Sequence, residues 1–150
     1  MLGPGLLLFL RLFVSGRSVA LRMEHRRAVP HRDRMNSWKS IRLELDRTRD
    51  FPTGSVGRAF LLRVPLDDDG RIDEIAFRNS PHRATIRRHW SSEPDESGHL
   101  ERLEDGWAMR SNGKADRMLK LNGQALRLGE RIVLVDSTGA ALPFRIASIR

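Results

Sequence analysis

Hydrophobic and polar residues alternate along several short segments that begin near residue 38. In Trp38–Leu45, the side chains of Ile41, Leu43 and Leu45 fall on one face. A period of two residues is typical of a strand with one buried face. Other short segments with strand-like composition are 58–64, 85–90, 99–103, 106–110 and 117–121. The pattern therefore predicts a sheet rather than a bundle of helices.

The end of the sequence predicts a β-hairpin. Residues 131–136 (RIVLVD) form a β-branched run, and Ser137-Thr138-Gly139 is a turn sequence. In 142–149 (LPFRIASI) the residues alternate, so that Phe144 and Ile146 share a face with Leu142 and Ser148, while Ile149 falls on the opposite face. We expect these two segments to pair as antiparallel strands.

One segment has a helical period. Ile72, Ile75 and Ala76 are spaced i, i+3, i+4, and Asn79-Ser80-Pro81 ends the pattern. Turn or loop sequences lie at 50–54, 66–70, 91–98 and 104–106. The fold class we predict is mainly β (or α+β): a small single-domain antiparallel sheet over 36–150, barrel- or sandwich-like, with one short helix near residues 72–78.

Residues 1–34 do not share this alternation. The apolar run Leu6–Val14 and the small residues before Leu21 suggest an export signal cleaved near Ala20, but Arg11 interrupts the run and no basic residue precedes it. The run is also far shorter than the ~20 residues of a membrane span. We favour Met35 as the true start, which predicts a cytoplasmic protein. Export after cleavage and a disordered basic arm remain the alternatives.

Composition narrows the function classes. Hydrophobic residues make up 39% of the chain and charged residues 31%, which suits a soluble globular domain. There is no cysteine, so disulfides, thiolate metal sites and cysteine nucleophiles are excluded. The net charge is +8, of which +5 lies in residues 1–34 and +3 in the remainder. The folded part is therefore only mildly basic, and the charge by itself does not indicate a nucleic-acid partner.

No motif predicts a metal, a cofactor or a reaction. If Gly70 of the Asp67-Asp68-Asp69-Gly70 loop were the sixth residue of a calcium loop, Pro65 and Ala76 would stand where oxygen ligands are needed. His82, His89 and His99 lack the spacing of a zinc site. The patterns of a phosphate-binding loop and of a serine nucleophile turn are missing too. We therefore expect no cofactor and a non-enzymatic role.

The candidate binding residues are Arg87, Arg88, His89, Trp90 and His99. Arginine beside an aromatic residue can clamp a phosphate or stack on a base. The alternative interpretation is a strand that buries Ile86 and Trp90 while its arginines face solvent. We favour the second interpretation, because three acidic residues follow within the next loop and would repel a phosphate backbone.

The stretch from Trp38 to Arg150 resembles small uncharacterised bacterial proteins that share a PLDDDGRID-type loop, here Pro65–Asp73, and a final PFRIASI-type strand, here Pro143–Ile149. This resemblance implies no activity, ligand or site residue. Our leading hypothesis is a binding module for a protein or a small ligand. The second hypothesis is nucleic-acid binding through residues 87–90 and the basic N-terminal arm.

Overall fold

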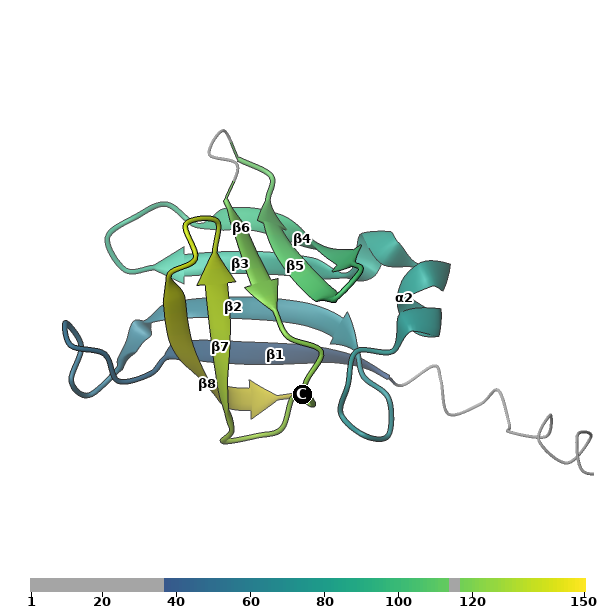
Figure 1. The fold of residues 1–150 in the computed structure, drawn as a ribbon, viewed down its shortest axis with the longest axis horizontal. Coiled ribbons are helices and arrows are strands. Elements are labelled where there is room, and N and C mark those ends of the chain that lie inside the picture. Colours follow the sequence, from purple (N-terminus) through teal and green to yellow (C-terminus); the bar gives the residue numbers. More distant parts are fainter. Residues whose placement is uncertain (1–36, 114–116) are drawn as a thin grey trace, which may run out of the picture. The chain divides into compact units, whose positions relative to one another are not determined.

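The computed structural model describes residues 37–113 and 117–150, so the predictions for residues 1–34 lie outside it. In the described residues, eight strands form a closed antiparallel barrel (Figure 1). Each strand pairs with the next, and the last pairs with the first. The strands are β1 (Trp38–Leu45), β2 (Ser55–Pro65), β3 (Thr85–Trp90), β4 (Glu96–Leu103), β5 (Gly106–Ser111), β6 (Met118–Leu121), β7 (Arg131–Asp136) and β8 (Ala141–Ile149). The predicted β-rich antiparallel fold is confirmed.

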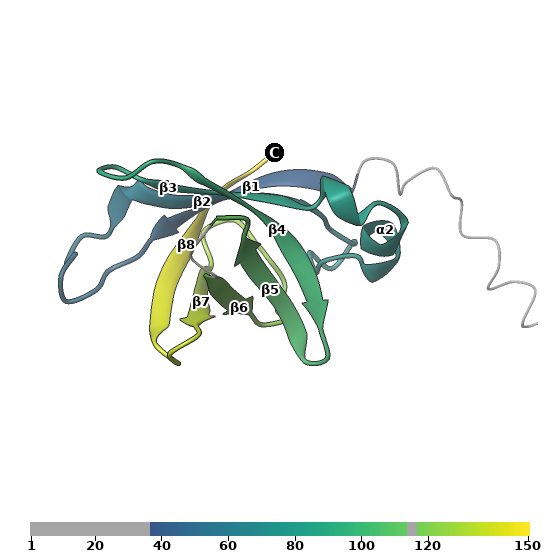
Figure 2. The same cartoon turned by 90° about the horizontal axis from the view of Figure 1, so that it is seen from above.

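Alternating side chains fill the interior of the barrel. Figure 2 shows β1–β3 on one side and β5–β7 on the other. Ile41, Leu43 and Leu45 all point inward and are buried, as their spacing predicted. Phe144 and Ile146 of β8 are fully buried beside them. Each such side chain contributes about 1.5–3 kcal/mol relative to an exposed one, so this inner face is the main source of stability.

The helix α2 (Glu74–Asn79) and the 3-10 turn η2 (Pro81–Arg83) connect β2 to β3. The helix begins two residues later than predicted, because the Asp73 carboxylate caps it and accepts hydrogen bonds from the backbone N–H groups of Ile75 and Ala76 at 3.0 and 3.1 Å. Ile75 is exposed, although it shares the i, i+3, i+4 spacing that predicted the helix. The helix instead packs through Phe77, whose ring meets that of Trp107 edge-on at 4.9 Å.

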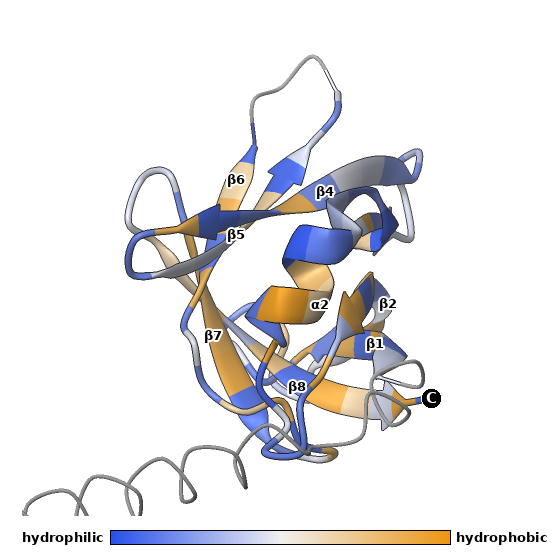
Figure 3. Ribbon diagram, turned by 90° about the vertical axis from the view of Figure 1, so that its right-hand side faces the viewer, coloured by the Kyte–Doolittle hydropathy of each residue, from blue (hydrophilic) through white to orange (hydrophobic). Residues whose placement is uncertain are grey.

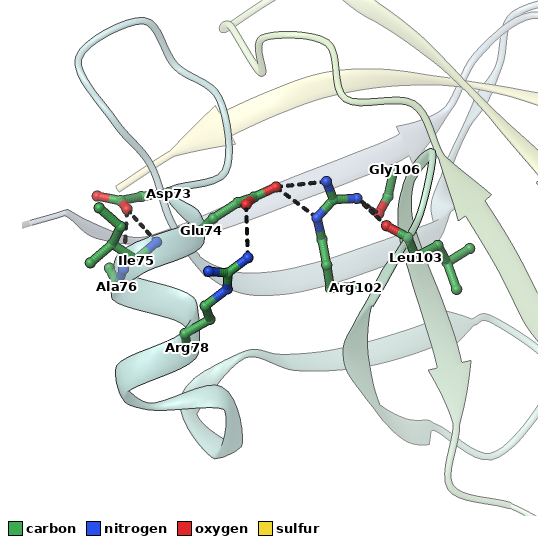
Figure 4. Close-up of polar contacts among 8 residues, drawn as sticks. All are labelled: Asp73, Glu74, Ile75, Ala76, Arg78, Arg102, Leu103 and Gly106. Carbon is green, nitrogen blue, oxygen red and sulfur yellow. Dashed lines mark hydrogen bonds and ion pairs between the residues drawn. The ribbon is translucent and has the colours of Figure 1, made fainter.

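An arginine of β4 holds the helix against the barrel. The Nε and Nη2 atoms of Arg102 both lie 2.7 Å from Oε1 of Glu74 (Figure 4). Nη1 of Arg102 donates to the backbone oxygens of Gly106, at 2.7 Å, and Leu103. The helix therefore lies across one end of the barrel (Figure 3). Within the described ranges, no helix is long and apolar enough to span a bilayer.

Two local predictions are wrong. Residues 96–98 are not loop but the start of β4, because Glu96, Ser97 and Gly98 pair with β3. Ile149 does not lie on the face opposite Phe144. The register between β1 and β8 shifts by one residue, so Ile149 pairs with Ile41 and packs against the core. A bulge of this kind adds one residue and reverses the alternation beyond it.

Candidate functional site

The end of the barrel away from α2 contains a cavity of about 330 Å³, which we call the mouth cavity. The strands alternate in direction, so the last residues of β3, β5 and β7 and the first residues of β4, β6 and β8 meet at this end. The apolar side chains that line it are Phe60, Ile86, Trp90, Met109, Met118, Leu119 and Leu142. The charged residues around its opening include Arg88, Glu96, Arg117 and Asp136.

Aromatic rings build the floor and one wall. The ring of Phe60 lies edge-on to Trp90 at 5.4 Å and to Phe144 at 5.3 Å between centroids. These three rings come from β2, β3 and β8, and strand pairing brings them together. Edge-on aromatic contacts add to the stabilisation from burial. The floor is therefore apolar and continuous with the core.

Arg88 points inward at the boundary between the apolar wall and the opening. Its side chain is only 14% exposed, and its guanidinium carbon lies 4.1 Å from the centroid of the Trp90 ring. Nη1 donates a hydrogen bond of 2.8 Å to Glu93, in the loop between β3 and β4. The same atom lies 3.9 Å from Oε1 of Glu96. A cation is thus held inside the barrel wall by one hydrogen bond, one aromatic ring and one longer ion pair.

Glu96 lies between two guanidinium groups. Nη1 of Arg117 is 3.6 Å from the same Oε1 atom that faces Arg88. The hydroxyl of Ser111 is 3.5 Å from Oε2. Both arginine distances exceed the usual N–H···O hydrogen-bond range, so these are ion pairs without a close hydrogen bond. One carboxylate is therefore shared between two arginines at the opening.

Two carboxyl groups near the opening have lowered pKa values. The hydrogen bond from Arg88, together with the positive charges of Arg88 and Arg117, lowers the pKa of Glu93. The pKa of Asp136 is lowered because its Oδ1 accepts from the hydroxyl of Thr138 at 2.6 Å and from the backbone N–H groups of Thr138 and Ala140. Asp136 is thus ionised and bound within its own turn.

The structure divides the predicted site residues between two faces. Arg88 and Trp90 point into the mouth cavity, whereas Arg87 and His89 point outward from the same strand. His99 also points outward, and its Nδ1 lies 2.7 Å from the Asn112 side-chain oxygen. The interpretation that the arginines of this strand face solvent is correct for Arg87 and wrong for Arg88. Alternation in a strand prevents all five residues from forming one site.

The sequence did not identify several residues of the mouth cavity. The sequence pattern predicts a loop for Glu96 and strands for Arg117 and Met109, and it indicates no role for any of the three. Their approach depends on the pairing of β3 with β4 and of β5 with β6. The signal available in the sequence was local: Arg88 shares its strand face with Ile86 and Trp90, both large apolar residues.

Several kinds of polar group line the mouth cavity. Its described lining contains hydroxyls, guanidinium groups and carboxylates but no histidine. Over the described ranges, no three His, Cys, Asp or Glu side chains come together as a metal site. In the acidic loop after β2, Oδ1 of Asp67 accepts from the backbone N–H groups of Asp69 and Arg71, each at 2.9 Å, and so stabilises a turn.

Comparisons with known proteins add no assignment to this geometry. No protein-family model, curated protein or solved structure matches the chain. The resemblance of Trp38–Arg150 to small bacterial proteins therefore stays a prediction.

Proposed function

We propose that the barrel binds a small amphipathic molecule, with the apolar part of the molecule in the mouth cavity and an acidic group beside Arg88 and Arg117. The observation that carries this proposal is the position of Arg88. Its guanidinium is largely withdrawn from solvent at the inner edge of an apolar cavity. A cation in such a place is costly to keep unless it is paired. Among the described residues only Nη1 of Arg88 donates a hydrogen bond, to Glu93, so its Nε and Nη2 can donate to an acidic group of a ligand.

The size and lining of the cavity support a ligand of modest size. Ligand pockets are commonly in the range of about 300–1,000 Å³, mostly apolar, with a few polar groups that fix orientation. The mouth cavity has a volume of about 330 Å³ and the apolar floor formed by Phe60 and its neighbours. Burial of apolar ligand surface would supply affinity at about 25 cal/mol per Å² before the costs of association.

The guanidinium groups at the opening can bind an acidic group of a ligand. Arg88 already pairs with Glu93 and Glu96, Arg117 pairs with Glu96, and the carboxylate of Asp136 is occupied within its own turn. A carboxylate or sulfonate on the ligand would add a second anion between the two guanidinium groups. Arginine binds such groups through paired N–H donors, and these hydrogen bonds are stronger than neutral ones.

Decanoate and 1-decanol test the proposal, because they share an alkyl chain and differ in the charged group. Isothermal titration should show decanoate binding more tightly than decanol to the full chain. Arg88→Met should weaken decanoate binding by about 10- to 100-fold, the equivalent of about 1.5–3 kcal/mol for a charge-assisted hydrogen bond. It should leave the affinity for decanol nearly unchanged.

Arg87→Met is the matched control, since it removes the same charge from the neighbouring position on the outer face. We expect Arg87→Met to change neither affinity. Equal losses from the two substitutions, or equal affinities of the native chain for decanoate and decanol, would contradict the proposal.

A further inference from the structure

The outer side of the barrel wall has a second hollow, of about 720 Å³, over β1–β4 and the end of β8. We call it the basic groove. Four arginines line it: Arg42, Arg63, Arg87 and Arg150. Its described lining contains no aspartate or glutamate. The charged side chains of the groove are therefore all of one sign, on a domain whose described residues otherwise carry many ion pairs.

The arginines of the basic groove follow a regular order across the strands. Arg42 of β1 and Arg87 of β3 both stand opposite Leu61 of β2. Arg63 is two residues further along β2, so it is the diagonal neighbour of both. Arg150 continues the order, because its backbone exchanges hydrogen bonds of 2.8 and 3.0 Å with Ser40 on β1.

The four arginines thus come from β1, β2, β3 and the residue that follows β8. Arg63 and Arg150 lie in one row across the sheet, and Arg42 and Arg87 lie in the neighbouring row. Diagonal neighbours of this kind are about 7–8 Å apart at their Cα atoms. Small hydroxyl residues occupy much of the space between them, including Ser40, Thr85 and Ser148. The result is a zigzag of cations separated by hydrogen-bonding groups.

Most of these cations are available to a partner. Arg63, Arg87 and Arg150 are exposed and make no side-chain hydrogen bond or ion pair with any residue in 37–113 or 117–150. Arg42 is the exception: its Nε donates to Oε1 of Glu44 at 2.8 Å, and its Nη2 donates to the backbone oxygen of Val56. Arginines without partners, on the outer face of a sheet, do not stabilise the fold through ion pairs.

We propose that the basic groove binds the phosphate backbone of a nucleic acid. A zigzag of equally charged groups matches a polymer with one anion per repeat better than it matches a single small anion. Arginine, serine, threonine and asparagine side chains are the residues that usually contact phosphates and sugars. The described lining has no aromatic side chain on which a base could stack. Binding should therefore show little dependence on sequence.

This surface differs from the one that the strand composition suggested. Trp90 is part of the inner wall, and Arg88 faces the mouth cavity. Of the residues 87–90, only Arg87 lines the basic groove. The two proposals use opposite sides of the barrel wall, so each can fail without the other.

Fluorescence anisotropy with the full chain tests this proposal. The probes are a mixed-sequence single strand of about 20 nucleotides and the corresponding duplex, a length that covers several phosphate contacts. The groove variant combines Arg63→Ser with Arg87→Ser. The control variant combines Arg49→Ser with Arg127→Ser, which removes the same charge from exposed positions outside the groove lining. A conservative variant, Arg63→Lys combined with Arg87→Lys, keeps both charges and should retain most of the affinity.

We expect the groove variant to bind about tenfold more weakly at low salt than the native chain. The slope of log affinity against log salt concentration should fall by about 1.5–2, the value for two lost phosphate contacts. The control variant should keep the native slope. Equal effects of the two variants, no change in the slope, or binding of heparin without either oligonucleotide would overturn the proposal.

Discussion

Arg87 and Arg88 are adjacent in the sequence and lie on opposite sides of the barrel wall. Arg87 is exposed on the outer face and lines the basic groove, whereas Arg88 is 14% exposed and faces the mouth cavity. Strand alternation causes this separation. Two residues of one type therefore serve as internal controls for each other: each substitution removes the same charge from the same strand but from a different surface.

Substitution of Arg88 should change the titration of Glu93. The Arg88 guanidinium lowers the pKa of Glu93, mainly through its hydrogen bond. We therefore expect Arg88→Met to raise the pKa of Glu93 toward its usual value, and Arg87→Met to leave it unchanged. Carboxyl-carbon chemical shifts followed by NMR across the acidic pH range measure this directly.

The same pair makes stability depend on pH in a defined direction. A carboxyl group with a lowered pKa in the folded state stabilises the fold above its usual pKa, and that contribution is lost as the pH falls through the lowered pKa. The stability difference between the native chain and Arg88→Met should therefore shrink as the pH is lowered from neutral. A difference that grew in acid would contradict the role given to this pair.

Phe144 should be among the most sensitive core positions. It is fully buried and meets the ring of Phe60 edge-on. Phe144→Ala should lower the free energy of unfolding by about 3–5 kcal/mol, because it leaves a cavity in the floor of the barrel. Urea denaturation followed by circular dichroism measures the loss. Leu128→Ala, at a position that is 67% exposed, should stay within about 0.5 kcal/mol of the native value.

The contact between Arg102 and Glu74 should affect the helix more than the whole fold. The two side chains are 35% and 42% exposed, so solvent screens their attraction. Arg102→Gln should cost about 1 kcal/mol or less in global stability and should speed hydrogen exchange at the amides of α2. Arg127→Gln serves as the control. A global loss above about 3 kcal/mol would mean that the pair behaves as a buried one.

Alternation along the chain predicted most of the fold. It placed Ile41, Leu43 and Leu45 on the buried face and located most strands within two or three residues. It failed at Ile149, because a bulge in β8 reverses the faces without leaving a mark in the hydrophobic pattern. The alternation also did not distinguish a barrel from a sandwich, because the barrel is closed by the pairing of β8 with β1.

The candidate site was less predictable for a related reason. Alternation grouped Arg88 with Ile86 and Trp90, but a charged residue among apolar ones gives no indication of whether it faces a cavity or solvent. Glu96 and Arg117 reach Arg88 only through pairings between strands. Such contacts join residues far apart in the chain, and composition does not contain them.

The most direct test of the account is the position of decanoate on the barrel. Intermolecular NOEs between its methylene protons and protein methyl groups distinguish the two sides of the wall. We predict NOEs to the inward-facing methyl groups of Ile86, Met109 and Leu142. NOEs confined to Leu61 and Val133, which are exposed on the outer surface, would contradict the proposal that the barrel binds its ligand inside.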